Sequence, residues 1–260
     1  MVNLLLDKIA QACESLKLTG ILSSYQSIAD NCAKEGLSYT EYLAQILNYE
    51  TVTREQRKQQ TLLKLAGFPK AKKLEEFDFT CAQVNHAQIQ ELATLRFMHN
   101  NENVILLGPS GTGKTHLAIG LGYIATQQER KVKFITAADL MLQMQAAHAQ
   151  NKLDKYLNRY VKTTRILIID EFGYLRFNEQ QANFFFQLVN KRYETGSLII
   201  TSNLTFTKWK EVLNDDEALT AAILDRLIHH SSIVLIQGDS YRLKQKKKAG
   251  ILPASLINQA

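Results

Sequence analysis

The chain has 260 residues, 45% of them hydrophobic, which is enough for one large domain or two smaller ones with a sizeable core. Lysine and arginine outnumber aspartate and glutamate by 31 to 25, and this excess favours an anionic partner without identifying one. The N-terminus lacks the basic segment of a signal peptide, and no stretch reaches the roughly 18 apolar residues of a membrane span, so we expect a cytosolic protein that does not bind membranes.

Residues 1–69 are predicted to form a small, all-helical domain that binds DNA or a partner protein. Apolar residues recur at helical spacing from Leu5 onward. The sequence "SYTE" at 38–41 is a capping box ahead of a longer helix. The sequence "GFP" at 67–69 is expected to end that helix at Ala66.

Residues 70–102 are expected to form a charged connector that leads through a short helix near 86–98 into an α/β core. From Asn103 onward, short apolar runs alternate with helical segments, which predicts a five-stranded parallel sheet with helices on both faces. This core is expected to span 103–238, followed by a basic tail at 239–260. The predicted strands are 103–108, 131–137, 165–170, 197–202 and 231–237.

A glycine-rich loop follows the first predicted strand and opens a helix. The sequence "GPSGTGKT" fits G-x-x-x-x-G-K-[ST], the P-loop that binds a nucleoside triphosphate. Glycines let backbone N–H groups close around phosphates, and the helix N-terminus supplies further donors. Lys114 is predicted to reach the β- and γ-phosphates, and the Thr115 hydroxyl to bind Mg²⁺. The alternative is an ordinary glycine turn. The predicted nucleotide-binding residues are Gly108, Pro109, Ser110, Gly111, Thr112, Gly113, Lys114, Thr115 and His116.

Two carboxylates end the third predicted strand, "RILIID", at the edge of the sheet where ligands of α/β proteins bind. Asp170 is placed to hold Mg²⁺ through water. Glu171 is not needed for the metal and is predicted to polarise the water that attacks the γ-phosphate. The alternative is that both acids only cap the following helix.

The fourth predicted strand ends in Asn203. If this strand is inserted between the P-loop strand and the Asp170 strand, Asn203 lies beside the γ-phosphate and can orient the attacking water. An inserted strand with a glutamate after the aspartate is similar to the additional-strand ATPases, and the terminal asparagine is similar to the AAA+ family. Small GTPases lack that glutamate, and the guanine-reading motif N/T-K-x-D is absent from the sequence. The alternative is that Asn203 merely ends the strand, as asparagine often does.

The helix "ILDRLIHH" precedes the fifth predicted strand. In AAA+ proteins an arginine at this place projects into the nucleotide of the neighbouring subunit, and Arg226 is the matching residue. An arginine supplied by a neighbour stabilises the transition state and makes hydrolysis depend on assembly. The alternative for Arg226 is a salt bridge within one subunit.

These motifs in this order resemble the IstB family, the AAA+ helper ATPases of insertion-sequence transposons, which are related to the DnaC helicase loader and the DnaA initiator. The resemblance covers the whole chain and rests on "GPSGTGKTHLAIGLG", "ILIIDEFGYL", "IITSNL" and "DRLIHH" followed by "GDSYRLK". It implies a bacterial, DNA-associated protein that binds ATP, self-assembles head to tail, binds double-stranded DNA without strong sequence preference and activates a transposase. The helical lid of AAA+ proteins does not fit in the residues after 238, so Arg242 is a sensor, a DNA contact or neither.

A basic stripe is predicted between the second and third strands, where initiator-type relatives carry an extra helix lining a DNA channel. Spacings of three and four residues place several cations on one helix face, which neutralises phosphates in a salt-dependent, sequence-tolerant way. Tyr156 and Tyr160 are candidates for stacking on bases, but we expect them to pack in the core instead. The alternative for the stripe is a solvated basic face. The run "RLKQKKK" at 242–248 is a second candidate for DNA contact, and its alternative is a solvated tail. The predicted DNA-binding residues are Lys152, Lys155, Arg159 and Lys162.

Three functions remain open on these grounds. The first is an ATP-dependent transposition helper assembled on DNA. The second is a DnaC-like replicative helicase loader, which shares every active-site residue with the first. The third is a DNA-binding scaffold that holds ATP without significant turnover, against which the presence of Glu171 argues.

Overall fold

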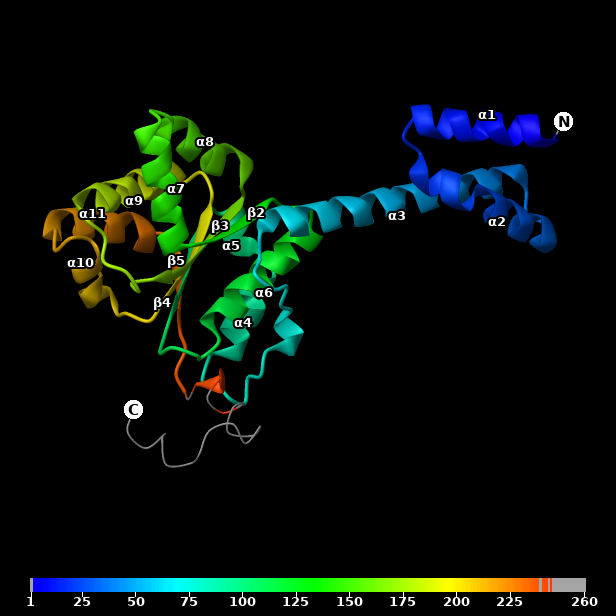
Figure 1. Cartoon of the computed structure of the whole chain (residues 1–260). Helices are drawn as coiled ribbons and strands as arrows, with labels where there is room; N and C mark the ends of the chain where they lie inside the picture. The colour runs from blue at the N-terminus through cyan, green and yellow to red at the C-terminus, as the bar shows by residue number, and fades with distance from the viewer. Residues whose placement is uncertain (1, 239, 243, 245–260) are drawn as a thin grey trace. The chain divides into compact units, whose positions relative to one another are not determined.

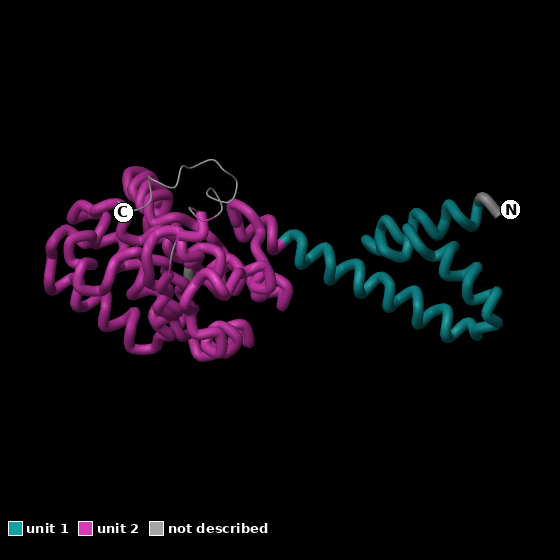
Figure 2. Tube along the Cα trace, turned by 90° about the horizontal axis from the view of Figure 1, so that it is seen from below, with its two compact units in different colours: residues 1–61 teal, residues 62–260 magenta. Residues whose placement is uncertain are grey.

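The computed structural model describes residues 2–238, 240–242 and 244, with the side chains of 2, 3, 161 and 162 left out. The chain divides into two compact units, residues 1–61 and 62–260 (Figure 2). Most of the predicted basic tail, including all but Lys244 of the run 244–248, lies outside the described residues.

The first unit is helical, as predicted. It contains α1 (Val2–Ser15), α2 (Thr19–Glu35) and the beginning of α3 (Tyr39–Ala66). The capping box at the start of α3 is confirmed, because the Glu41 carboxylate accepts from the Ser38 backbone N–H at 2.7 Å and Glu41 N–H donates to the Ser38 hydroxyl at 3.3 Å. Helix α3 ends at Ala66, also as predicted.

The buried interior of this unit includes one carboxylate. Glu50, 5% exposed, accepts from the Ile21 backbone N–H at 2.9 Å and from Arg54 Nε at 2.6 Å. Burial opposes ionisation of Glu50, but the hydrogen bonds from Arg54 and Ile21 outweigh it and lower the pKa of this carboxyl. The acid therefore ties the start of α2 to the middle of α3.

The connector differs in one detail from its prediction. A 3₁₀ turn, η1 (Leu74–Glu76), precedes two helices, α4 (His86–Ala93) and α5 (Arg96–His99), where a single helix was predicted near 86–98. The break falls at Leu95, which has a left-handed φ of 60°. That conformation costs about 1–2 kcal/mol, and the full burial of the Leu95 side chain offsets it.

The sheet of the second unit contains five parallel strands in the order β2-β3-β4-β1-β5 (Figure 1). This arrangement confirms the predicted α/β fold and places β4 between β1 and β3. The strands are β1 (Asn103–Leu107), β2 (Val132–Thr136), β3 (Ile166–Phe172), β4 (Ser197–Ser202) and β5 (Ser231–Leu235).

Helices cover both faces of this sheet. Successive side chains of a buried strand point to opposite faces, so each face is apolar and packs against its own layer of helices. On β1, Ile105 and Leu107 join one core, and Val104 and Leu106 join the other. The first core includes residues of α7 (Ala137–Ala149), α8 (Leu153–Thr163), α9 (Glu179–Arg192), α10 (Trp209–Val212) and α11 (Glu217–Ile228). The second includes residues of α4, α5 and α6 (Lys114–Gln127). A 3₁₀ turn, η2 (Phe206–Lys208), precedes α10.

The topology brings the carboxyl ends of β1, β4 and β3 to one edge of the sheet in adjacent positions. The P-loop follows β1, Asn203 follows β4, and the two acids lie at the end of β3. No helix in the described part of the chain is long and apolar enough to cross a membrane.

Candidate nucleotide-binding site

The P-loop turns sharply between β1 and α6, and two of its glycines have left-handed backbone angles. Gly111 has φ of 83° and Gly113 has φ of 98°. A Cβ at Gly113 would lie 2.5 Å from the Phe77 ring, and one at Gly111 would lie 2.2 Å from the Ser240 hydroxyl. Both positions therefore require glycine for conformation and for space.

The Lys114 side chain folds back into the loop. Its Nζ donates to the carbonyl oxygens of Gly108 and Pro109, each at 2.7 Å. Burial lowers the pKa of the Lys114 ammonium, and the charge of Asp170 opposes this change. The loop thus holds a cation among backbone groups at the N-terminus of α6, where a phosphate is favoured.

Thr115 and Asp170 form the second part of the site. The Thr115 hydroxyl lies 2.9 and 3.1 Å from the two carboxylate oxygens of Asp170, which is 4% exposed. A hydroxyl and one carboxylate suit Mg²⁺, which usually takes one or two carboxylates and keeps several waters. The described residues contain no group of three His, Cys, Asp or Glu that could hold a metal.

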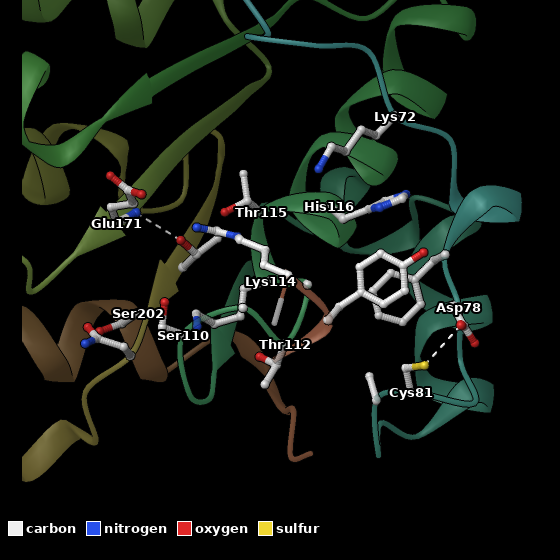
Figure 3. Close-up of a pocket in the computed structure, with 18 of the residues that line it drawn as sticks. Lys72, Asp78, Cys81, Ser110, Thr112, Lys114, Thr115, His116, Glu171 and Ser202 are labelled. Carbon is white, nitrogen blue, oxygen red and sulfur yellow. Dashed lines mark hydrogen bonds between the residues drawn. The ribbon is translucent and has the colours of Figure 1, made fainter. Parts of the chain in front are cut away.

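The P-loop and Glu171 face a cleft of about 400 Å³, a size typical of ligand sites (Figure 3). Asp170 lines an adjoining pocket that shares Thr115, Glu171 and Arg242 with this cleft. Glu171 is exposed in this cleft and Asn203 lines it as well, as the insertion of β4 predicts. The predicted nucleotide-binding residues that line it are Ser110, Gly111, Thr112, Gly113, Lys114, Thr115 and His116.

One wall of the cleft comes from the connector, which sequence reasoning missed. Phe77 and Asp78 line the cleft on the side of α6, and the Phe77 ring meets the His116 ring edge to face at 5.4 Å. Hydrogen bonds from Thr80 and from the Cys81 thiol lower the pKa of Asp78 to about 2 and fold the turn on itself. In this charged stretch, the two phenylalanines of "EEFDF" were the sequence feature that could have indicated a packed wall of the cleft.

Residues 10–249 match the IstB-like ATP binding protein family of IS21-type elements. The chain belongs to this family. It is 44% identical over 238 residues to an IS21 ATP-binding protein of Pseudomonas aeruginosa, covering 91% of this chain and 89% of the relative. It is 41% identical over 242 residues to an IS5376 ATP-binding protein of Geobacillus stearothermophilus, covering 93% and 96%.

Two solved structures share the fold of this IstB-like chain. The replication initiator DnaA bound to AMPPCP and single-stranded DNA has a TM-score of 0.56 at 21% identity, covering 74% of this chain and 60% of DnaA. The crystal structure of DnaI has a TM-score of 0.54 at 18% identity, covering 70% of this chain and 92% of DnaI. At these identities the likeness concerns the fold alone.

Arg226 of the IstB-like chain is not among the residues that line the cleft. Its Nε donates to the Asn190 side chain at 3.0 Å and its Nη1 to the Ala222 carbonyl at 2.9 Å. The guanidinium lies 5.2 Å from the centre of the Phe186 ring. These contacts are neutral and hold the side chain on the face formed by α9 and α11. Among the residues that the structure describes, Arg226 makes none of the salt bridges considered as the alternative.

The predicted basic stripe lies on and just before α8. Lys152, Lys155 and Arg159 are exposed, while the Lys162 side chain lies outside the described residues. Asp154 pairs with Lys191 of α9 at 2.8 Å, which draws the nearest carboxylate away from the stripe. Tyr156 and Tyr160 are packing residues, as interpreted, and their hydroxyls bond each other at 2.8 Å.

Four further residues that line the cleft were not predicted or not assigned a role. The Tyr174 hydroxyl, from the loop after β3, donates to the Ser110 hydroxyl at 3.1 Å. Arg242 lines the cleft beside Tyr241, whose N–H donates to the Gly111 carbonyl at 3.0 Å. Thr201 of β4 contacts both acids of β3.

Proposed function

We propose that this chain is an ATPase that assembles on double-stranded DNA and activates the transposase of its insertion sequence. The observation that carries the proposal is the edge of the sheet where three neighbouring strands bring together a P-loop, a hydroxyl–carboxylate pair and an exposed glutamate. Membership of the IstB-like ATP binding proteins supports ATP as the nucleotide. The insertion-sequence origin of the relatives supports a role in transposition.

The residues divide the work of hydrolysis among them. Backbone N–H groups of the P-loop and α6 bind the phosphates, and Lys114 exchanges its carbonyl partners for β- and γ-phosphate oxygens. Thr115 and Asp170 would hold Mg²⁺, which neutralises charge developing on the phosphates. Glu171, exposed at the strand end, accepts a proton from water that Asn203 helps to orient.

Assembly completes the site. Arg226 does not line the cleft of its own subunit, and in this proposal it contributes to catalysis from a neighbour stacked head to tail. The stripe on α8 contacts DNA phosphates, and the helical domain at 1–69 binds DNA or the partner. The stretches 70–102, 103–238 and 239–260 then act as connector, ATPase core and basic tail.

The helicase-loader alternative shares this active site, so the partner separates the two. The insertion-sequence relatives favour a transposase. A transposase reading frame beside the gene, and stimulation of that enzyme in a purified transposition reaction, would support the assignment. Stimulation of helicase loading in its place would contradict it.

The scaffold alternative is tested by turnover. Glu171→Gln is expected to keep ATP binding and to lose hydrolysis by about 10²–10⁴-fold, since it removes the base but not the phosphate contacts. Lys114→Ala is expected to weaken ATP binding itself. Glu179→Gln, at an exposed acid on α9, is the matched control and should hydrolyse ATP normally. A Glu171→Gln protein that turned over at the wild-type rate would refute the assigned base, and a wild-type protein inactive with DNA would favour the scaffold.

A further inference from the structure

Thr201 occupies the centre of the site without having been predicted there. It lies on β4 and is 1% exposed. Its hydroxyl donates to Asp170 Oδ1 at 2.5 Å and accepts from the Glu171 backbone N–H at 3.0 Å. A hydroxyl offers one donor and two acceptor positions, so both bonds form at once.

The pairing of β3 with β4 explains why one residue reaches both acids. Ile169 pairs with Ile200 and Phe172 pairs with Ser202, so two residues of β3, Asp170 and Glu171, lie opposite Thr201 alone. This is a β-bulge, a feature that re-aims side chains beside active sites. Glu171 has a left-handed φ of 61° at the bulge, and its side chain is exposed at the cleft (Figure 3). The side chains of its neighbours, Asp170 and Phe172, are buried.

The bulge interrupts the backbone ladder between the two strands. The Glu171 N–H then needs another acceptor, because a buried backbone donor is rarely left unpaired. The Thr201 hydroxyl supplies that acceptor from a side chain. It also holds Asp170 Oδ1, the oxygen that lies 2.9 Å from the Thr115 hydroxyl.

We infer that Thr201 is a positioning residue that sets the metal-binding carboxylate of Asp170 and the catalytic carboxylate of Glu171 through one shared hydroxyl. The inference rests on the proposed ATPase function. Thr201 acts through the two acids and not on the phosphates, so its loss affects Mg²⁺ dependence and kcat more than the Mg²⁺-free binding of nucleotide. Groups that orient metal ligands in this way typically contribute about 10–100-fold to metal affinity or activity.

The test compares Thr201→Val, which keeps the branched shape without the hydroxyl, with Thr201→Ser, which keeps the hydroxyl. ATP hydrolysis is measured over a Mg²⁺ titration. Binding of a fluorescent ATP analogue is measured in EDTA and over the same Mg²⁺ titration. The control is Thr126→Val, because Thr126 is fully buried and its hydroxyl donates to the Tyr123 carbonyl within α6, away from the two acids.

Thr201→Val is expected to lower kcat by about 10–100-fold and to raise the Mg²⁺ concentration for half-maximal activity severalfold. Thr201→Ser should restore most of both values, and Thr126→Val should change neither. Thr201→Ala serves as a second hydroxyl-free variant if the valine variant unfolds at the assay temperature. Unchanged kcat and Mg²⁺ dependence in the hydroxyl-free variant, or a serine variant as impaired as valine, would overturn the inference.

An inactive wild-type protein would instead contradict the proposed ATPase function. The inference about Thr201 is then decided by the Mg²⁺ dependence of analogue binding. Loss of that dependence in Thr201→Val with rescue by Thr201→Ser supports the shared hydroxyl, and identical Mg²⁺ dependence in all variants overturns it.

Discussion

The basic stripe on α8 allows a quantitative prediction about DNA binding. Lys152, Lys155 and Arg159 are the members whose described side chains are exposed, and all three are replaced by glutamine in one variant. Lysine and arginine at helical spacing contact phosphates without reading base edges, so affinity for duplex DNA should fall on every sequence tested. None of these three residues lines the cleft, so ATP binding by the isolated subunit should survive.

The magnitude follows from counterion release. Each phosphate contact contributes about 0.9 to the slope of log affinity against log salt, so loss of three contacts reduces the slope by about 2.7. Over a fourfold rise in salt, from about 50 to about 200 mM, the wild-type protein should then lose about 40-fold more affinity than the variant. Fluorescence anisotropy at several salt concentrations measures both slopes.

A matched variant separates this local effect from a general loss of charge. It replaces three exposed cations on other elements, Arg96, Arg130 and Lys208, by glutamine. Its slope should stay close to that of the wild-type protein. A stripe variant with an unchanged slope, or a control with an equal reduction, would show that the DNA runs elsewhere, and the helical domain at 1–69 would be the next region to test.

Two further predictions concern assembly and stability. Mixing Arg226→Ala subunits with Glu171→Gln subunits should restore some ATPase activity, because a mixed interface joins an intact Glu171 to an intact Arg226. If no activity returned at any ratio although the subunits co-assembled, an arginine acting in trans would be excluded. Arg192, 1% exposed, donates to four backbone carbonyls at 2.7–3.1 Å. Arg192→Met should therefore lower the free energy of unfolding by about 2–4 kcal/mol in urea denaturation, because buried acceptors lose their donors; a stability equal to wild type would mean that water replaces the guanidinium.

Local sequence patterns were sufficient for much of the fold and, within the site, for the P-loop and the two acids. The P-loop between β1 and α6, the acids ending β3, the capping box before α3 and the strands of the sheet were predictable. Each depends on residues within a few positions of one another, where glycine conformations, helix caps and apolar runs act directly on the backbone. The insertion of β4 between β1 and β3 was expected only as the condition under which Asn203 would lie beside the γ-phosphate. The structure confirms that insertion.

Only the tertiary structure decided which distant residues share the cleft. The connector wall around Phe77 and the pairing of Thr201 with Asp170 join segments remote in sequence, so no periodicity or motif signals them. The break at Leu95 likewise follows from burial in a core assembled from other elements, which outweighs the helical preference of the local sequence. The sequence by itself thus determined which functional side chains lie at the strand ends, because short-range backbone preferences fix the strands and the loops that follow them. The orientation of that chemistry was decided by the bulge where β3 meets β4, since a hydrogen bond across a sheet exists only after the strands have paired.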